Sequence, residues 1–284
     1  MRRWSSAISR PISPTCAVTR EPAMSPNTVA VWLLNLDTGG SDRYAALLRF
    51  PGLLSDAEQA HALAYRHEGA SVLYIHGRAL LQLMLRHHLP PLPEFSAPRC
   101  ALRIEKGGKP VLTGAFADSG LEFNISHSGN HLACALAWRR QVGIDIEALG
   151  RATNCEDVAA RHYSPFEQAD LMRLEGEARR ERFFYYWTLK EAYLKARGGS
   201  IAGQLDEISF VPMSDGTVLV QDAFDKDADA HWGFTVLNAL PGCQLALCWE
   251  RQSSCFTPAV ALRIIDVAEL GAQAQSFAPQ AVCQ

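Results

Sequence analysis

Residues 131–147 read HLACALAWRRQVGIDIE, and this stretch decides the fold. Its two apolar runs, 131–138 and 142–147, each have the length of one buried strand, and a short polar segment separates them. Further along the chain, QLALCWER at 244–251 repeats the pattern of the first run. A repeated pattern of this kind predicts two similar halves, the first ending at residue 140 and the second beginning at 141.

The elements on either side of this junction follow the same order, a strand, then helices, then further strands. The first half is predicted to contain a strand at 29–36, a helical region at 55–89, and strands at 102–105, 121–125 and 131–138. The second is predicted to contain a strand at 142–147, helices from 164 and over 179–197, and strands at 207–212, 216–221, 232–237 and 244–250. We therefore predict an α+β fold of two pseudo-symmetric α/β halves, with the active site in the cleft between them.

The domain limits follow from these elements. We expect an N-terminal half at 29–140 and a C-terminal half at 141–250, while 251–284 stays unassigned apart from one plausible strand at 260–267. Residues 1–28 are expected to be a disordered extension, with Met24 as the favoured start. The first 20 residues are rich in Arg and Ser and contain no acid, a composition that organellar transit peptides share.

Helix limits can be predicted from short polar signals. Ser55 with Glu58 forms the pattern of a capping box, and so does Ser164 with Glu167. A proline at 165 fits the first turn of the second of these helices. Prolines at 90, 91 and 93 would end the region 55–89, and glycines at 198 and 199 would end the helix 179–197.

Composition excludes several classes of function. The chain has 27 Lys and Arg against 30 Asp and Glu, a formal charge of −3, so no global basic field attracts nucleic acid. Its apolar runs are shorter than the ~20 residues that a membrane helix needs. The 8 cysteines form no CxxC pair, which favours a reducing cytoplasm. We expect no nucleic-acid or membrane partner.

Asp145 and Glu147 are candidate metal ligands. Side chains two apart on a strand point to the same face, so the two carboxylates project together while the isoleucines between them face the core. Crowded carboxylates repel each other unless a cation lies between them, and a sparse set of oxygen ligands favours Mg²⁺. The alternative is an exposed strand end with two solvated acids.

A second constellation is WTLKEAYLK at 187–195. Trp187, Glu191 and Lys195 are four residues apart and would share one helix face, with Lys190 on its flank. The aromatic residues around them predict that part of this helix is buried, so a carboxylate and an ammonium at its edge suggest a ligand cleft. The alternative is a stabilising salt bridge on the surface.

Further candidates would bind an anion. Lys109 follows a predicted glycine turn at 107 and 108, while Ser126, His127 and Ser128 end a strand, where two hydroxyls and an imidazole could hold a phosphate. Arg66 and Arg78 lie in the helical region of the first half, where a guanidinium can clamp a phosphate. Each of these residues could equally be structural or solvated.

Four motifs taken together resemble one family. The segments GKP at 108–110, FNISHS at 123–128, GIDIE at 143–147 and WTLKEAYLK at 187–195 stand in the order found in the Sfp-type 4′-phosphopantetheinyl transferases. The resemblance covers about 29–250. It implies two pseudo-symmetric halves that bind coenzyme A, and transfer of its phosphopantetheine arm to a serine of an apo acyl or peptidyl carrier protein, with release of adenosine 3′,5′-bisphosphate.

The resemblance also implies roles for the candidates. Mg²⁺ would be held by Asp145, Glu147 and Glu191, and Glu191 would also accept the serine proton, either directly or through water. The pyrophosphate charge would be offset by Lys195 and more weakly by Lys190. Coenzyme A would be contacted by Lys109, Ser126, His127, Arg66 and Arg78. The pattern around Arg66 departs from that of many relatives, so the register of that helix is open. A chain with both halves is expected to work as a monomer.

Two other functions remain open from the sequence. A magnesium-dependent nucleotide phosphohydrolase would use the same carboxylates to activate water. A catalytically inactive coenzyme A binding regulator would bind coenzyme A without modifying any carrier. The carrier and its pathway cannot be read from the sequence, although Arg179, Arg180 and Arg182 are possible docking residues for an acidic carrier, with a solvated helix face as the alternative.

Overall fold

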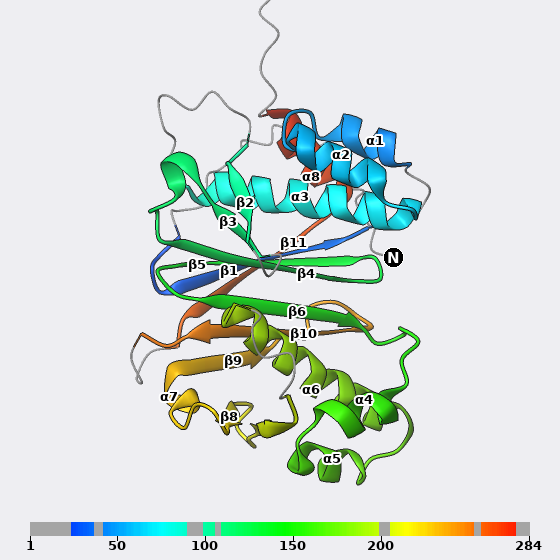
Figure 1. Ribbon diagram of the computed structural model, residues 1–284, viewed down its shortest axis with the longest axis vertical. Coiled ribbons are helices and arrows are strands. Elements are labelled where there is room, and N and C mark those ends of the chain that lie inside the picture. Colours follow the sequence, from blue (N-terminus) through cyan, green and yellow to red (C-terminus); the bar gives the residue numbers. More distant parts are fainter. Residues whose placement is uncertain are drawn as a thin grey trace, which may run out of the picture.

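Two β-sheets lie one above the other in the computed structural model, with helices on both outer sides (Figure 1). The structure describes residues 24–36, 42–89, 99–105, 109–198, 205–252 and 257–276. The predicted extension at 1–28 therefore lies mostly outside the described residues, as do the glycines at 107, 108 and 199 and the prolines at 90, 91 and 93. None of the described helices is long and apolar enough to cross a membrane.

The first sheet has the strand order β11-β1-β5-β4. Its strands are β1 (Thr28–Asn35), β4 (Leu121–Ser128), β5 (His131–Trp138) and β11 (Ala259–Ile265). Its outer face is covered by α1 (Arg43–Arg49), α2 (Asp56–Ala64), α3 (Glu68–His88) and α8 (Val267–Ser276). Along β1, Trp32 and Leu34 pack toward these helices and Val31 and Leu33 pack toward the second sheet, so one strand contributes to two cores.

The second sheet has the order β6-β10-β9. Its strands are β6 (Val142–Ala148), β9 (Trp232–Val236) and β10 (Cys243–Glu250), and its outer side carries α4 (Cys155–His162), α5 (Pro165–Leu171) and α6 (Gly176–Ala196). Smaller elements are β2 (Leu102–Ile104), β3 (Pro110–Leu112), β7 (Ile208–Pro212), β8 (Val218–Asp222), α7 (Ala228–His231) and two single 3₁₀ turns. The α+β fold class predicted from the sequence is confirmed.

Gly143 sets the distance between α6 and β6. A Cβ atom at this position would overlap the backbone carbonyl of Ala192 and come within 2.5 Å of the backbone nitrogen of Ala196. Only a residue without a side chain allows the helix backbone to approach the strand so closely. The glycine of GIDIE therefore brings the helix that carries Glu191 and Lys195 onto the strand that carries the two acids.

The predicted helical region 55–89 contains two helices, α2 and α3. The start of the region is confirmed, because Ser55 and Glu58 form a capping box. The helical backbone is interrupted at Tyr65–His67, and α3 begins at Glu68. Arg43 stabilises this break, since its Nη1 atom donates to the carbonyls of Leu63 and Tyr65 at 3.0 Å each. Arg43 lies in α1, which the sequence reading missed.

The C-terminal tail packs on the first sheet. Strand β11 pairs in parallel with β1, and α8 contributes the buried residues Leu270 and Ala274 to the core between α3 and this sheet. The plausible strand at 260–267 is thus confirmed at Ala259–Ile265, while α8 was not predicted. We keep the division into halves at 29–140 and 141–250 as a proposal, and add that the tail supplements the first half.

Candidate active site

Three carboxylates gather where β4, β6 and α6 meet. Asp145 and Glu147 project from one face of β6, while Ile144 and Ile146 pack between the two sheets. Glu191 reaches the same region from α6, and its charge acts on Asp145 while that of Glu147 acts on Glu191. The strand and the helix thus bring their acids into one electrostatic cluster, as the sequence predicted.

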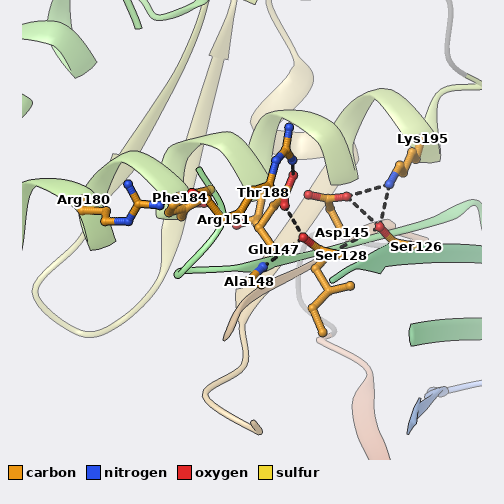
Figure 2. A network of polar contacts seen from close by, with 11 residues as sticks. Ser126, Ser128, Asp145, Glu147, Ala148, Arg151, Arg180, Phe184, Thr188 and Lys195 are labelled. Atoms are coloured by element: carbon orange, nitrogen blue, oxygen red, sulfur yellow. Dashed lines mark hydrogen bonds and ion pairs between the residues drawn. The ribbon is translucent and has the colours of Figure 1, made fainter. Parts of the chain in front are cut away.

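Asp145 is the most deeply buried of the three, at 4% exposure. Its Oδ1 atom accepts hydrogen bonds from Lys195 Nζ at 2.6 Å and from Ser126 Oγ at 2.8 Å (Figure 2). Its Oδ2 atom is buried without a hydrogen-bond partner. Burial raises the pKa of this carboxyl to about 6, against the opposing effects of Lys195 and Ser126. A positive charge near Oδ2 would therefore stabilise the ionised form of Asp145.

Glu147 and Glu191 differ in their partners. Glu147 Oε2 accepts from Ser128 Oγ at 2.5 Å, and its Oε1 accepts from Arg151 Nη1 at 2.6 Å (Figure 2). Burial raises the pKa of Glu191, and the charge of Glu147 raises it further, while Lys195 and His162 lower it. A carboxylate with a raised pKa holds a proton more readily, which suits a proton acceptor.

The acid cluster fits a divalent cation in the chemistry of its donors. It offers carboxylate oxygens from three side chains, including the unpartnered Oδ2 of Asp145. Among the described residues, no group of three or more histidine, cysteine, aspartate or glutamate side chains lies close enough together to hold a metal ion by itself. Mg²⁺ does not need a full set of protein ligands, because it commonly binds one or two carboxylates and completes its octahedron with water and substrate phosphates.

Lys190 does not belong to this cluster, and its predicted place among the catalytic residues is corrected. Its side chain is fully buried on another face of α6 and pairs with Glu167 at 2.8 Å. Its ammonium also donates to the carbonyls of Leu205 at 2.7 Å and Ile208 at 2.5 Å. The residue ties α6 to α5 and to the start of β7, because its long side chain points into the core of the second half.

Lys190→Met is expected to lower the free energy of unfolding by about 3–5 kcal/mol, since it leaves the buried Glu167 carboxylate without its counter-charge. Urea unfolding followed by fluorescence measures this change. Adding Glu167→Gln should recover part of the loss. If Lys190→Met instead slows transfer at unchanged stability, Lys190 returns to the catalytic set.

A cavity of about 510 Å³ shares strand β4 with the acid cluster. Helices α2 and α3 form one wall and strands β2 to β5 form the other, with Tyr65, Tyr74, Arg78, Ile125 and His127 in the lining. All its lining residues belong to the first half, whereas the acids belong to the second. Strand β4 joins the two, because Ile125 and His127 line the cavity and Ser126 and Ser128 bind the acids.

The predicted anion-binding residues are only partly brought together. Arg78 and His127 line the cavity, and Arg78 Nε lies 3.0 Å from Glu58 Oε1. Arg66 is exposed in the break between α2 and α3 and is not among the cavity's lining residues. Lys109 lies 3.5 Å from Glu122, at the opposite end of β4 from His127. Loss of solvent around its ring and the charge of Lys195 lower the pKa of His127, while the charge of Glu147 raises it.

The three arginines proposed for docking have partners within the chain. Arg179 Nε donates to the carbonyl of Leu171 at 3.0 Å, and Arg182 Nη1 donates to Asp170 at 3.0 Å. Arg180 donates to the carbonyls of Leu149 and Arg151. These contacts hold the loops around α4 and α5, so the three guanidinium groups have a structural role that does not depend on any carrier.

Comparison with known proteins identifies the family. The 4′-phosphopantetheinyl transferase superfamily model matches residues 141–248. The 4′-phosphopantetheinyl transferase HetI of Nostoc is 38% identical over 180 residues, which are 63% of this chain and 72% of that protein. The chain belongs to the 4′-phosphopantetheinyl transferase superfamily. The predicted family resemblance is thus confirmed.

Two further similarities cover less of the chain. The transferase AcpT of Escherichia coli is 38% identical over 128 residues, 45% of this chain and 58% of that protein. A holo-(acyl-carrier-protein) synthase structure from Bacillus anthracis covers 40% of this chain at 21% identity, with a TM-score of 0.34, and 96% of its own chain. The superfamily match begins at residue 141, at the predicted start of the second half.

Three further residues surround the acids of this transferase; sequence reasoning missed Asn124 and Arg151 and expected Ser128 to bind an anion rather than an acid. Ser128 and Arg151 bind Glu147, and Asn124 Oδ1 accepts a hydrogen bond from the backbone N–H of Ile144 at 3.1 Å. A signal for two of them was present, because Asn124, Ser126 and Ser128 alternate with Ile125 and His127. Such alternation in a strand places the polar residues on one face.

Proposed function

We propose that this chain transfers the 4′-phosphopantetheine group of coenzyme A to a serine of an apo carrier protein and releases adenosine 3′,5′-bisphosphate. Membership of the superfamily supports the reaction class. The observation that carries the proposal is the electrostatic coupling of Asp145, Glu147 and Glu191 with Lys195, next to a strand, β4, that also lines a cavity large enough for part of a nucleotide.

Asp145, Glu147 and Glu191 are the residues that would hold Mg²⁺. The unpartnered Oδ2 atom of Asp145 and the raised pKa values of Asp145 and Glu191 support this assignment, since both show carboxylates short of positive charge. When bound, the ion would neutralise charge on the pyrophosphate and on the departing phosphate.

The side chains themselves supply the remaining demands of the reaction. The serine hydroxyl of the carrier must lose a proton as it attacks the pantetheine-side phosphorus, and Glu191 is our candidate acceptor at its carboxylate. Glu191 serves as metal ligand, as base or as both. The ammonium of Lys195, 28% exposed beside Asp145, adds positive charge where the pyrophosphate would lie.

The cavity is the proposed place of the nucleotide half of coenzyme A. Its lining combines the tyrosines Tyr65 and Tyr74 with the guanidinium of Arg78 and the imidazole of His127, a composition that suits a base and a phosphate. A phosphate near the imidazole of His127 would raise the pKa of that ring, because a nearby anion favours the charged form. Lys109 and Arg66 stay as sequence-based proposals, weaker for the positions described above, because Lys109 pairs with Glu122 and Arg66 lies outside the cavity lining.

Mass spectrometry of intact apo carrier proteins tests the proposed function. Incubation with coenzyme A and Mg²⁺ should add one phosphopantetheine to at least one member of a panel of acyl, peptidyl and aryl carriers. Cleavage of coenzyme A at the same rate with and without carrier would instead show a phosphohydrolase. Coenzyme A binding that survives Glu191→Ala, with no carrier modified, would show an inactive regulator.

His127→Ala is expected to raise the apparent KM for coenzyme A on the order of 10-fold, and to change that for 3′-dephospho-coenzyme A much less, because a charge-assisted hydrogen bond to the 3′-phosphate is lost. Steady-state kinetics with both substrates measures the difference. Lys109→Ala is the comparison, and its pairing with Glu122 leads us to expect a smaller effect. Equal effects of His127→Ala on both substrates would move the residue away from the 3′-phosphate.

We also propose that the protein acts as a monomer in the cytoplasm. One chain supplies both the cavity residues of the first half and the acids of the second, so no second copy is needed to complete the site.

A further inference from the structure

The two sheets meet at a pair of strand edges. Strand β4 is the last strand of the first sheet and β6 is the first strand of the second. They lie side by side (Figure 1), yet no backbone pairing is found between β4 and β6 in the part of the chain that the structure describes. The backbone N–H groups on this edge of β6 therefore need other acceptors, because buried donors are rarely left unpaired.

Side chains of β4 provide these acceptors at every second residue. The N–H of Ile144 donates to Asn124 Oδ1 at 3.1 Å, that of Ile146 to Ser126 Oγ at 3.4 Å, and that of Ala148 to Ser128 Oγ at 3.0 Å. The residue numbers advance by two on both strands, so the two strands run in the same direction. The side chains replace the carbonyls that a parallel backbone ladder would use.

The two serines of this ladder also hold the two acids of β6. A backbone N–H can only donate, so each hydroxyl accepts that bond and gives its own proton to the neighbouring carboxylate. Ser126 donates to Asp145 Oδ1 and Ser128 donates to Glu147 Oε2. The hydroxyls that join β4 to β6 are thus the same hydroxyls that orient the proposed metal ligands.

We propose that Ser126 and Ser128 are positioning residues, which fix the register between the halves and the direction of both β6 carboxylates. This inference deepens the proposed function and rests on it only for the role of the carboxylates. Asn124 belongs to the same ladder but forms no hydrogen bond to either carboxylate. Its role is therefore confined to joining β4 to β6.

The ladder also limits what Ser126 can do for coenzyme A. A hydroxyl has one donor and two acceptor sites. Ser126 Oγ donates to Asp145 and accepts from the N–H of Ile146 and from Lys195 Nζ at 2.9 Å. All three sites are used, and the residue is 5% exposed. We therefore assign the hydroxyl to the acid cluster and the cavity-facing imidazole of His127 to the substrate.

Three measurements on Ser126→Ala and Ser128→Ala test this proposal. Amide hydrogen exchange should quicken at Ile146 in the first variant and at Ala148 in the second, at least 10-fold in each. The dissociation constant for Mn²⁺, measured by electron paramagnetic resonance with coenzyme A present, should rise about 10- to 100-fold, the range found when a partner of a metal ligand is removed. Coenzyme A binding without metal should change less than about 2-fold.

Two further variants separate positioning from simple structural support. Ser128→Thr keeps the hydroxyl and should retain most of the Mn²⁺ affinity that Ser128→Ala loses. Asn124→Ala should quicken exchange at Ile144 while leaving Mn²⁺ affinity within about 3-fold. Ser71→Ala, which removes another buried hydroxyl that donates to the carbonyl of Ala62 at 2.7 Å, controls for general loosening and should leave Mn²⁺ affinity unchanged.

The outcomes distinguish this proposal from the proposed function. Unchanged exchange at Ile146 and Ala148 overturns the ladder, whatever reaction the protein catalyses. Faster amide exchange with unchanged Mn²⁺ affinity would show that the two serines do not orient the acids, which overturns that part of the proposal. Loss of metal-free coenzyme A binding in Ser126→Ala would make that serine a substrate contact. A protein that shows the predicted exchange and Mn²⁺ changes but modifies no carrier would keep the ladder and lose the transferase proposal.

Discussion

Asp145→Asn should slow phosphopantetheine transfer on the order of 1,000-fold, because the centre loses a charged oxygen ligand where charge develops on the phosphates. The fold should persist, since an amide oxygen still accepts from Ser126 and Lys195 and a buried charge is removed. Initial rates of carrier modification by intact mass measure the first effect, and urea unfolding measures the second, which should stay within about 1 kcal/mol.

Glu156→Gln is the matched control for Asp145→Asn. Its side chain is 81% exposed on α4 and pairs with Arg179, so removing its charge should leave the transfer rate unchanged. An Asp145→Asn variant with near wild-type rates at ordinary Mg²⁺ concentration would show that Asp145 is not a ligand of the reacting centre.

Gly143→Ala should cost both stability and transfer. Its new methyl group would overlap the backbone of α6 at Ala192, so the helix must move away from β6. Overpacking of this kind costs about 1–3 kcal/mol of unfolding free energy, or more where the obstacle is backbone. A shift of about 1 Å between Glu191 and the β6 acids should also lower the transfer rate on the order of 100-fold.

Gly69→Ala is the control for Gly143→Ala. Gly69 lies in the first turn of α3, where a Cβ atom would meet nothing within 4 Å, so an added methyl should not destabilise the protein. Transfer rates and urea unfolding of both variants separate the effect of the methyl group from that of its position. A Gly143→Ala protein with wild-type stability and rate would mean that α6 does not rest on β6 as described.

The sequence was sufficient to place the acids because their local patterns are strong. Alternation in GIDIE determines that Asp145 and Glu147 share a face, and the spacing of four between Glu191 and Lys195 determines that these share a side of α6. The capping boxes at Ser55 and Ser164 could be predicted for the same reason, since each lies within four residues.

Features that depend on distant partners could not be predicted. Lys190 follows the same helical pattern as its neighbours. Only the fold shows that its ammonium pairs with Glu167 and donates hydrogen bonds to two backbone carbonyls. The break before α3 needs Arg43, more than 20 positions earlier than Tyr65. The pairing of β11 with β1 joins strands near the two ends of the described residues, and nothing in the apolar pattern of 260–267 indicates its partner.

The central claim is that acids from β6 and α6 act on one centre, and Mn²⁺ binding tests it most directly. Wild-type protein with coenzyme A should bind one Mn²⁺ in an electron paramagnetic resonance titration, and Asp145→Asn and Glu191→Gln should each weaken that binding strongly. Combining the two substitutions should add little to either alone. Binding that is unchanged in one of the single variants would contradict the claim that strand and helix share the ion.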